Sequence, residues 1–149
     1  MITKFGKQKL EEQLKNLQKD LAKTCKNRGK AAEEGDLKEN SAYIFLGERA
    51  QVLYSQIDQV KADLHQEVIQ PAPIQIETIV FGSKVKVRFE SDNREMEITL
   101  VGKNDFNLKP GWISSESPLG IALLNQTKGS KVSVNNQLVT ILDISIGEI

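Results

Sequence analysis

The sequence predicts an α+β fold, with an N-terminal antiparallel α-helical coiled-coil hairpin and a C-terminal, mainly antiparallel sheet that includes one short helix. Three observations lead to this fold class. Apolar residues recur every three or four positions as far as Leu64, which is the spacing of a helical seam. Gln70–Pro73 then forms a break that neither a helix nor a central strand tolerates. Short apolar runs separated by turn residues follow, and these are typical of strands.

The hairpin is predicted from two apolar seams. The first helix carries four leucines spaced four, three and four residues apart: Leu10, Leu14, Leu17 and Leu21. Thr3 is expected to cap its start, and the seam weakens where Thr24 and Arg28 take its next positions. The second helix carries seven residues spaced alternately three and four apart: Tyr43, Leu46, Ala50, Leu53, Ile57, Val60 and Leu64. Two such helices bury their seams by folding back on one another.

The segment between the helices, Glu33–Tyr43, is expected to form the tip of the hairpin. Gly35 suits the left-handed position just past a helix end. Asp36 suits the N-cap of the second helix, and Glu39 follows three residues later as its capping partner. The same two carboxylates offer the oxygen ligands that Mg²⁺ prefers, provided that another molecule completes the coordination. The local pattern leaves both roles open.

The charge is balanced overall but divided between the two helices. The net charge is zero, so no overall field draws the chain to nucleic acid or to a membrane. Between Lys4 and Lys30 there are nine basic and three acidic residues, and between Glu33 and Glu67 there are three basic and eight acidic ones. Four lysines on the outer side of the first helix are spaced four, three and four apart: Lys19, Lys23, Lys26 and Lys30. They form either a solvated helix face or a basic strip able to follow a phosphate backbone.

Several function classes have no support in the composition. Cys25 is the only cysteine and His65 the only histidine, so neither a disulfide framework nor a Cys/His zinc site is expected. The N-terminus lacks the apolar run of a signal peptide, and no stretch approaches about 18 apolar residues. A soluble, cytoplasmic protein is expected.

The break divides the chain into a hairpin at residues 1–70, a linker at 71–75 and a C-terminal domain at 76–149. In the C-terminal domain Ser117 and Pro118 are expected to open a short helix over Leu119–Leu124, with the proline at the first helical position. Six segments are expected as strands: Ile79–Phe81, Lys84–Phe89, Glu95–Val101, Gly111–Ser114, Lys131–Val134 and Leu138–Leu142.

Two separated motifs resemble the Gre transcript cleavage factors of bacterial RNA polymerase, and the GreA type most closely. The first is Gly35–Asn40, read as Gly-Asp-Leu-Lys-Glu-Asn, with Tyr43 following. The second is Ile113–Leu124, which contains the Ser-Pro pair of the short helix. The resemblance covers essentially all 149 residues and implies an FKBP-like C-terminal domain.

The resemblance also implies a function. The C-terminal domain would dock on the rim of the polymerase secondary channel, with Glu116, Ser117 and Pro118 in the docking segment. The hairpin would enter the channel, where Asp36 and Glu39 would help to hold a second Mg²⁺ and its attacking water near the 3′ end of the nascent RNA. The Mg²⁺ would be held jointly with polymerase, not tightly by the free protein. The chain would then be an activator of polymerase, not an enzyme by itself, and a monomer.

The sequence departs from the family pattern at several positions. Ala32 stands where the family usually has arginine, and Gly47 lies where a basic residue is common. Ile121 and Asn125–Gln126 replace family residues near the Ser-Pro pair, and Lys103–Phe106 replaces an acidic stretch. The alternative function is therefore a regulator or inhibitor that binds the secondary channel without efficient cleavage. A third is a coiled-coil scaffold or chaperone whose tip only caps a helix.

Overall fold

The computed structural model describes residues 1–35, 40–72 and 77–149. Its contacts divide the chain into two compact units. One is Gln8–His65, and the other combines Met1–Lys7 with Gln66–Ile149. The linker predicted at 71–75 stays a prediction, because residues 73–76 lie outside the described part of the chain.

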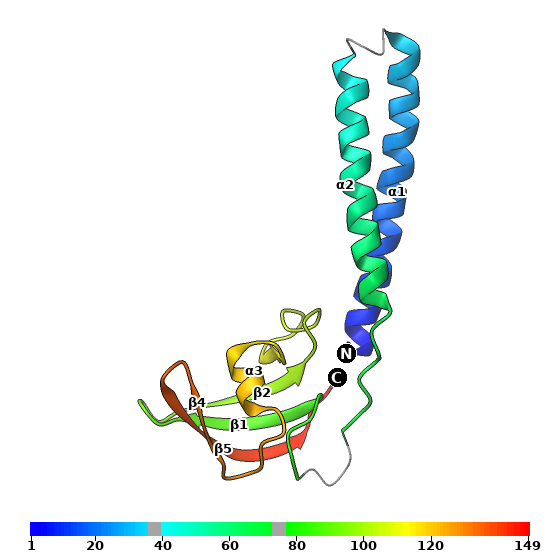
Figure 1. The fold of residues 1–149 in the computed structure, drawn as a ribbon. Helices are drawn as coiled ribbons and strands as arrows, with labels where there is room; N and C mark the ends of the chain where they lie inside the picture. The colour runs from blue at the N-terminus through cyan, green and yellow to red at the C-terminus, as the bar shows by residue number, and fades with distance from the viewer. Residues whose placement is uncertain (36–39, 73–76) are drawn as a thin grey trace. The chain divides into compact units, whose positions relative to one another are not determined.

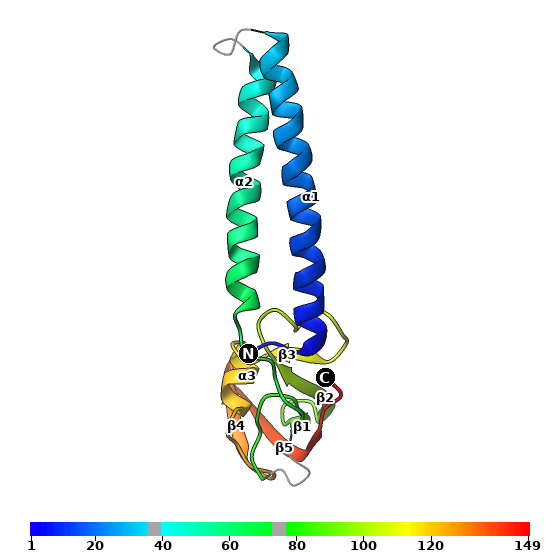
Figure 2. The ribbon, with the colours of Figure 1, turned by 90° about the vertical axis from the view of Figure 1, so that its right-hand side faces the viewer.

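The first unit is an antiparallel helical hairpin, as the sequence predicts. Helix α1 spans Lys4–Glu34, and helix α2 spans Ser41–Leu64. The two run side by side in opposite directions (Figures 1 and 2). The buried side chains of α2 all belong to its predicted seam: Ala50, Leu53, Ile57 and Val60. Burying a leucine, isoleucine or valine side chain contributes roughly 1.5–3 kcal/mol, so the packing of Leu53, Ile57 and Val60 stabilises the hairpin.

Helix α1 contributes a weaker seam. Leu10 is buried, whereas Leu14, Leu17 and Leu21 are only half-buried. Thr24 is 5% exposed although it is polar. No described span of α1 or α2 is apolar enough to cross a membrane. The hairpin is therefore stabilised by the apolar residues of α2 and by two contacts between the helices, of Asn40 with Ala31 and of Arg28 with Tyr43.

The second unit contains a five-stranded sheet with the strand order β3-β2-β1-β5-β4. Neighbouring strands are antiparallel except for β2 and β3, which are parallel. A short helix, α3, spans Pro118–Leu123 and packs on the sheet through Leu123 (Figure 1). The strands are β1, Ser83–Phe89; β2, Arg94–Val101; β3, Trp112–Ser114; β4, Lys131–Val134; and β5, Gln137–Ile146.

Alternation along β1 separates the core from the solvent. Val85 and Val87 are fully buried and lie opposite Ile98 and Met96 of β2. Lysines alternate with these valines and form ion pairs with glutamates of β2 on the exposed face, at 3.4 Å and 3.6 Å. Because successive side chains of a strand point to opposite faces, this one strand carries both the core and the charged surface.

One predicted strand is wrong. Ile79–Phe81 is not a strand, although Ile79 is fully buried. Ile79 exchanges backbone hydrogen bonds with the loop at Asn125 and Gln126, each 2.9 Å long. The chain then turns at Gly82, where φ is +84°. A short apolar run indicates that the segment is buried, and Ile79 is buried against a loop instead of a neighbouring strand.

The start of α1 is fixed inside the second unit. Thr3 Oγ accepts a hydrogen bond from Gly6 N at 2.9 Å, which confirms Thr3 as the N-cap. Asp105 is completely buried and accepts hydrogen bonds from Thr3 N at 3.0 Å and from Thr3 Oγ at 2.7 Å. Ile2 adds backbone hydrogen bonds to Glu67 and Ile69. The carboxylate of Asp105 therefore holds Thr3, and with it the start of α1, against the loop that contains Asp105.

Candidate functional site at the end of the hairpin

The predicted tip carboxylates, Asp36 and Glu39, lie outside the described residues. The structure does describe the residues on both sides of them in the chain. These are the last turns of α1 with Gly35 after them, and Asn40 with the first turns of α2. The candidate site is therefore built from its flanks.

Asn40 is the N-cap of α2, so the prediction that Asp36 caps this helix is wrong. The side chain of Asn40 accepts a hydrogen bond from Tyr43 N at 3.2 Å, and the helix begins at Ser41. Glu39 consequently precedes the cap and does not occupy the third helical position. Asparagine caps helices as well as aspartate does. Its amide also donates to the Ala31 carbonyl of α1 at 2.5 Å, which a carboxylate cannot do.

The cap at Asn40 bears on what the two tip carboxylates can do. Since Asn40 satisfies the start of α2, Asp36 and Glu39 are not needed there as caps. Within residues 1–35, 40–72 and 77–149, no three His, Cys, Asp or Glu side chains come together in a group that could hold a metal ion. A hard cation such as Mg²⁺ takes carboxylate oxygens, so Asp36 and Glu39 are the candidates with fitting chemistry. Their role in metal binding stays a prediction.

Arg28 forms a contact across the hairpin that the sequence does not reveal. Its guanidinium carbon lies 4.3 Å from the centre of the Tyr43 ring, in cation–π geometry. The guanidinium also lies against Gly47, with atoms 3.0–3.1 Å from the position that a Cβ would take there. The only hint in the sequence is that Arg28 occupies a seam position of α1. The sequence does not show that Gly47 faces it and leaves space for the guanidinium.

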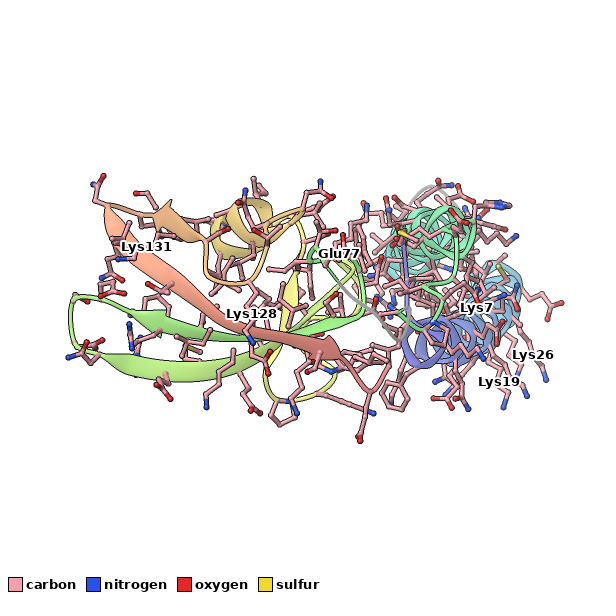
Figure 3. The ribbon with its side chains drawn as sticks, turned by 90° about the horizontal axis from the view of Figure 1, so that it is seen from below. Lys7, Lys19, Lys26, Glu77, Lys128 and Lys131 are labelled. Carbon is pink, nitrogen blue, oxygen red and sulfur yellow. The ribbon has the colours of Figure 1, made fainter. Side chains whose placement is uncertain are left out.

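The predicted basic strip lies on α1, and all four of its lysines are exposed. Figure 3 shows Lys19 and Lys26 pointing outward from the same side of α1, away from α2. A strip of this kind is equally compatible with a solvated face and with a phosphate backbone. Its role in RNA contact stays a prediction.

The predicted docking segment precedes and opens α3. Ser117 is the N-cap of this helix, because its Oγ accepts a hydrogen bond from Gly120 N at 3.0 Å. The same Oγ donates to the Ser114 carbonyl at 2.6 Å, and Pro118 takes the first helical position as expected. Glu116 is exposed, and its N–H donates to Ser114 Oγ at 3.1 Å. Ser117 therefore has a structural role whether or not it also contacts a partner.

Glu116, Ser117 and Pro118 line a hollow of about 720 Å³ in the second unit. Aromatic side chains of Phe106 and Trp112 form part of the same wall, and Phe106 is 49% exposed. Apolar hollows with a few polar groups at their edge are typical of binding surfaces. The docking role of the three residues stays a prediction.

Comparison with known families gives the class of protein. Residues 1–69 match the family model described as "Transcription elongation factor, N-terminal". Residues 74–146 match the one described as "Transcription elongation factor, GreA/GreB, C-term". The hairpin and the sheet thus occur in the order of a transcription elongation factor. The chain belongs to the GreA/GreB family of these factors.

Individual relatives resemble almost the whole chain. Transcription elongation factor GreA of Maridesulfovibrio salexigens is 35% identical over 135 residues, which are 90% of this chain and 84% of that protein. GreA of Chloroflexus aggregans is 35% identical over 136 residues, which are 90% and 87% of the two chains. Among solved structures, GreA factor homolog 1 of Thermus thermophilus is 21% identical, covers 96% of each chain and has a TM-score of 0.44.

Proposed function

We propose that this protein binds bacterial RNA polymerase through its secondary channel and stimulates the transcript cleavage that polymerase performs in backtracked complexes. Membership in the GreA/GreB family supports this function. The segment Gly35–Asn40 between α1 and α2 supports it further, because it holds two carboxylates in the family's pattern. The site of action would be the cytoplasm, where polymerase is found, and a monomer is the simplest form for a hairpin that enters a channel.

The observation that carries the proposal is the cap at Asn40. It accepts from Tyr43 N and donates to the Ala31 carbonyl, so the start of α2 needs neither Asp36 nor Glu39. The proposal therefore gives both carboxylates the role of oxygen ligands. Two ligands bind Mg²⁺ only weakly, and polymerase and RNA phosphates would complete the coordination. When bound, Mg²⁺ activates water and stabilises the charge that develops at the phosphate.

In this proposal the chain does not cleave RNA alone. Asp36 and Glu39 would position the metal and orient its water beside the RNA 3′ end, and polymerase would supply the remaining groups. Glu116 and Pro118, both exposed at the apolar hollow, would contact the rim of the channel. The chain would thus act as an activator of polymerase.

The test is transcript cleavage in stalled, backtracked polymerase complexes that carry RNA labelled at its 3′ end. The wild type should release short 3′ fragments, and Asp36→Asn and Glu39→Gln should abolish the release. Glu34→Gln is a matched control, because Glu34 is an exposed carboxylate in the last turn of α1. This control should cleave like the wild type, and added Mg²⁺ should partly restore the two tip variants.

Two outcomes would contradict the proposal. Full cleavage by Asp36→Asn would remove the metal-holding role of that carboxylate. Binding of the wild type to polymerase without any cleavage would instead favour a regulator or inhibitor that occupies the channel.

Docking is tested separately by a charge reversal at the hollow. Glu116→Lys should weaken the affinity for polymerase while leaving the fold intact, because the side chain is exposed. Ser117→Ala is a poor probe, since it removes the α3 cap as well. Unchanged affinity of Glu116→Lys, measured by competition with labelled wild type, would exclude this carboxylate from the docking surface.

A further inference from the structure

The loop between β2 and β3, residues 102–111, binds the chain segments that lead into and out of the hairpin. Asp105 accepts two hydrogen bonds from Thr3, next to the start of α1. Its neighbour Asn104 accepts a hydrogen bond of 2.6 Å from Gln66 Nε2, just after the end of α2. All of these residues belong to the second unit. One loop therefore holds the chain on both sides of the hairpin.

The loop and the start of α1 are packed too closely to move independently. A Cβ at Gly6 would overlap the carboxylate of Asp105, and a Cβ at Gly102 would overlap the carbonyl oxygen of Met1. Close-packed atoms transmit strain because they have little free space around them. A displacement of the loop therefore disturbs the first turn of α1, and the reverse also holds.

The same loop forms part of the wall of the apolar hollow. Lys103 and Phe106 line the hollow. The two residues between them, Asn104 and Asp105, instead bind the segments on either side of the hairpin. Phe106 is 49% exposed, whereas Asp105 beside it is completely buried. Four consecutive residues thus serve both the hollow and the ends of the hairpin.

A second connection between the hollow and α1 runs through Lys109. Its ammonium nitrogen lies 5.3 Å from the centre of the Phe5 ring and 5.3 Å from the centre of a Trp112 ring. Phe5 belongs to the first turn of α1, and Trp112 lines the hollow. A cation beside two aromatic rings is attracted to both. The hollow and the first turn of α1 are therefore connected at two places of one loop.

We propose that this loop couples the occupation of the hollow to the hold on the start of α1, so that a protein partner in the hollow strengthens the contacts of Asp105 and Lys109 with that helix. The inference rests on the proposed function, in which the partner is RNA polymerase. A partner that covers Phe106 orders the loop, and an ordered loop binds the start of α1 at a smaller entropic cost. Asp105 and Lys109 are then positioning residues for the hairpin.

The coupling is reciprocal, so loosening the start of α1 weakens binding in the hollow by the same factor. Thr3→Val removes the hydroxyl that donates to Asp105. Thr3 is completely buried, so its side chain cannot touch polymerase. The affinity of Thr3→Val for polymerase, measured by competition with labelled wild type, should be about fivefold weaker, the lower end of allosteric coupling.

A double-mutant cycle shows whether this effect passes through the hollow. In a Phe106→Ala background, Thr3→Val should weaken the affinity much less than in the wild type, because the hollow no longer orders the loop. A hairpin that binds less well on its own account, without the loop, would instead give the same loss in both backgrounds.

Hydrogen exchange at the start of α1 gives a second readout. Gly6 N donates to Thr3 Oγ, and Lys7 N donates to the Thr3 carbonyl. In the complex with saturating polymerase, these two amides should exchange about fivefold more slowly than in the free protein, by the same coupling factor. Phe106→Ala, also saturated with polymerase, should lose most of this slowing. Lys109→Met, which keeps the hydrogen bonds of Asp105, should lose part of it.

Two control variants separate the coupling from a general loss of structure. Thr3→Ser keeps the hydroxyl and should bind polymerase like the wild type. Met96→Ala shortens an exposed apolar side chain of the same unit that is not part of the wall of the hollow. It should change neither the affinity nor the exchange. Circular dichroism checks that each variant is folded, and if Thr3→Val is not, the exchange of the wild type and Phe106→Ala decides.

The outcomes separate this inference from the function on which it rests. Equal effects of Thr3→Val in the two backgrounds would overturn the coupling, as would full slowing of exchange in saturated Phe106→Ala. A wild type that binds polymerase but does not stimulate cleavage contradicts the proposed cleavage, while the cycle and the exchange still decide the coupling. A wild type that does not bind polymerase overturns both.

Discussion

The guanidinium of Arg28 lies against Gly47, with atoms 3.0–3.1 Å from the position of a Cβ at that residue. Glycine in the interior of a helix costs about 0.5–1 kcal/mol relative to alanine. Gly47→Ala should therefore gain helix propensity but push the guanidinium aside. Gly29→Ala in α1 should give the full gain, because nothing lies within 4 Å of its Cβ position. Chemical unfolding of the two variants should show the smaller gain for Gly47→Ala.

The same comparison in an Arg28→Ala background isolates the contact. Without the guanidinium, Gly47→Ala and Gly29→Ala should stabilise the hairpin by similar amounts. A coupling energy near zero between residues 28 and 47 in this double-mutant cycle would contradict the contact.

Asn40→Ala should lower the stability of the hairpin by about 1–2 kcal/mol, because it removes an N-cap and a hydrogen bond to the other helix. Asn40→Asp should recover part of the loss, since aspartate caps but cannot donate to the Ala31 carbonyl. Asp36→Ala should leave the helix stability unchanged. Thermal unfolding followed by circular dichroism would measure all three, and a large loss in Asp36→Ala would argue against Asn40 as the effective cap.

Asp105→Ala should destabilise the second unit by about 2–4 kcal/mol, because two buried donors of Thr3 lose their acceptor. Glu97→Ala is the control, since Glu97 is exposed and its ion pair with Lys84 is a surface contact. That variant should change the stability by less than about 0.5 kcal/mol. Urea unfolding measures both, and equal midpoints would show that the carboxylate of Asp105 contributes nothing.

Thr140→Val should raise the pKa of Glu90. The hydroxyl of Thr140 donates to Glu90 Oε1, and this hydrogen bond, with a smaller effect of Arg88, holds the pKa of Glu90 below its ordinary value of 4.5. A lowered pKa in the folded state means that the stabilisation is present above pH 4.5 and is lost as the pH falls through the folded pKa. Thr140→Val should therefore flatten the loss of stability in that acidic range.

Carboxyl NMR titration of Glu90 measures this pKa directly. Thr99→Val is the control, because Thr99 is also a buried threonine and is not among the groups that shift Glu90. An unchanged pKa in Thr140→Val would show that the hydroxyl does not stabilise the carboxylate.

The hairpin and most of the sheet were predictable because their signals are periodic. The seam of α2 and the alternation along β1 repeat often enough to fix both the element and its buried face. Ile79 shows the limit, because a short apolar run indicates burial without identifying the neighbour. The strand β5 runs to Ile146, beyond the predicted end at Leu142, because pairing with β1 continues past the most apolar part of the strand.

The site was predictable only where its chemistry is local. Asp36 and Glu39 come from the sequence alone, and their role stays a prediction. Asp36 and Asn40 are both good N-caps, so the choice between them depends on the Ala31 carbonyl of the other helix, which no local pattern contains. Asp105 and Arg28 were missed for the same reason, since their partners are distant in sequence. Thr3 is 102 residues from Asp105.

That separation has a consequence for how the chain is made. Residues 1–7 leave the ribosome well before residue 105, and at about 5–20 residues per second the wait is roughly 5–20 s. During that time Thr3 has no acceptor at Asp105, whereas the backbone partners of Ile2 at Glu67 and Ile69 are made earlier. The hairpin residues Gln8–His65 are contiguous and complete much earlier. The second unit is therefore completed well after the hairpin, once β5 has been made and can pair with β1.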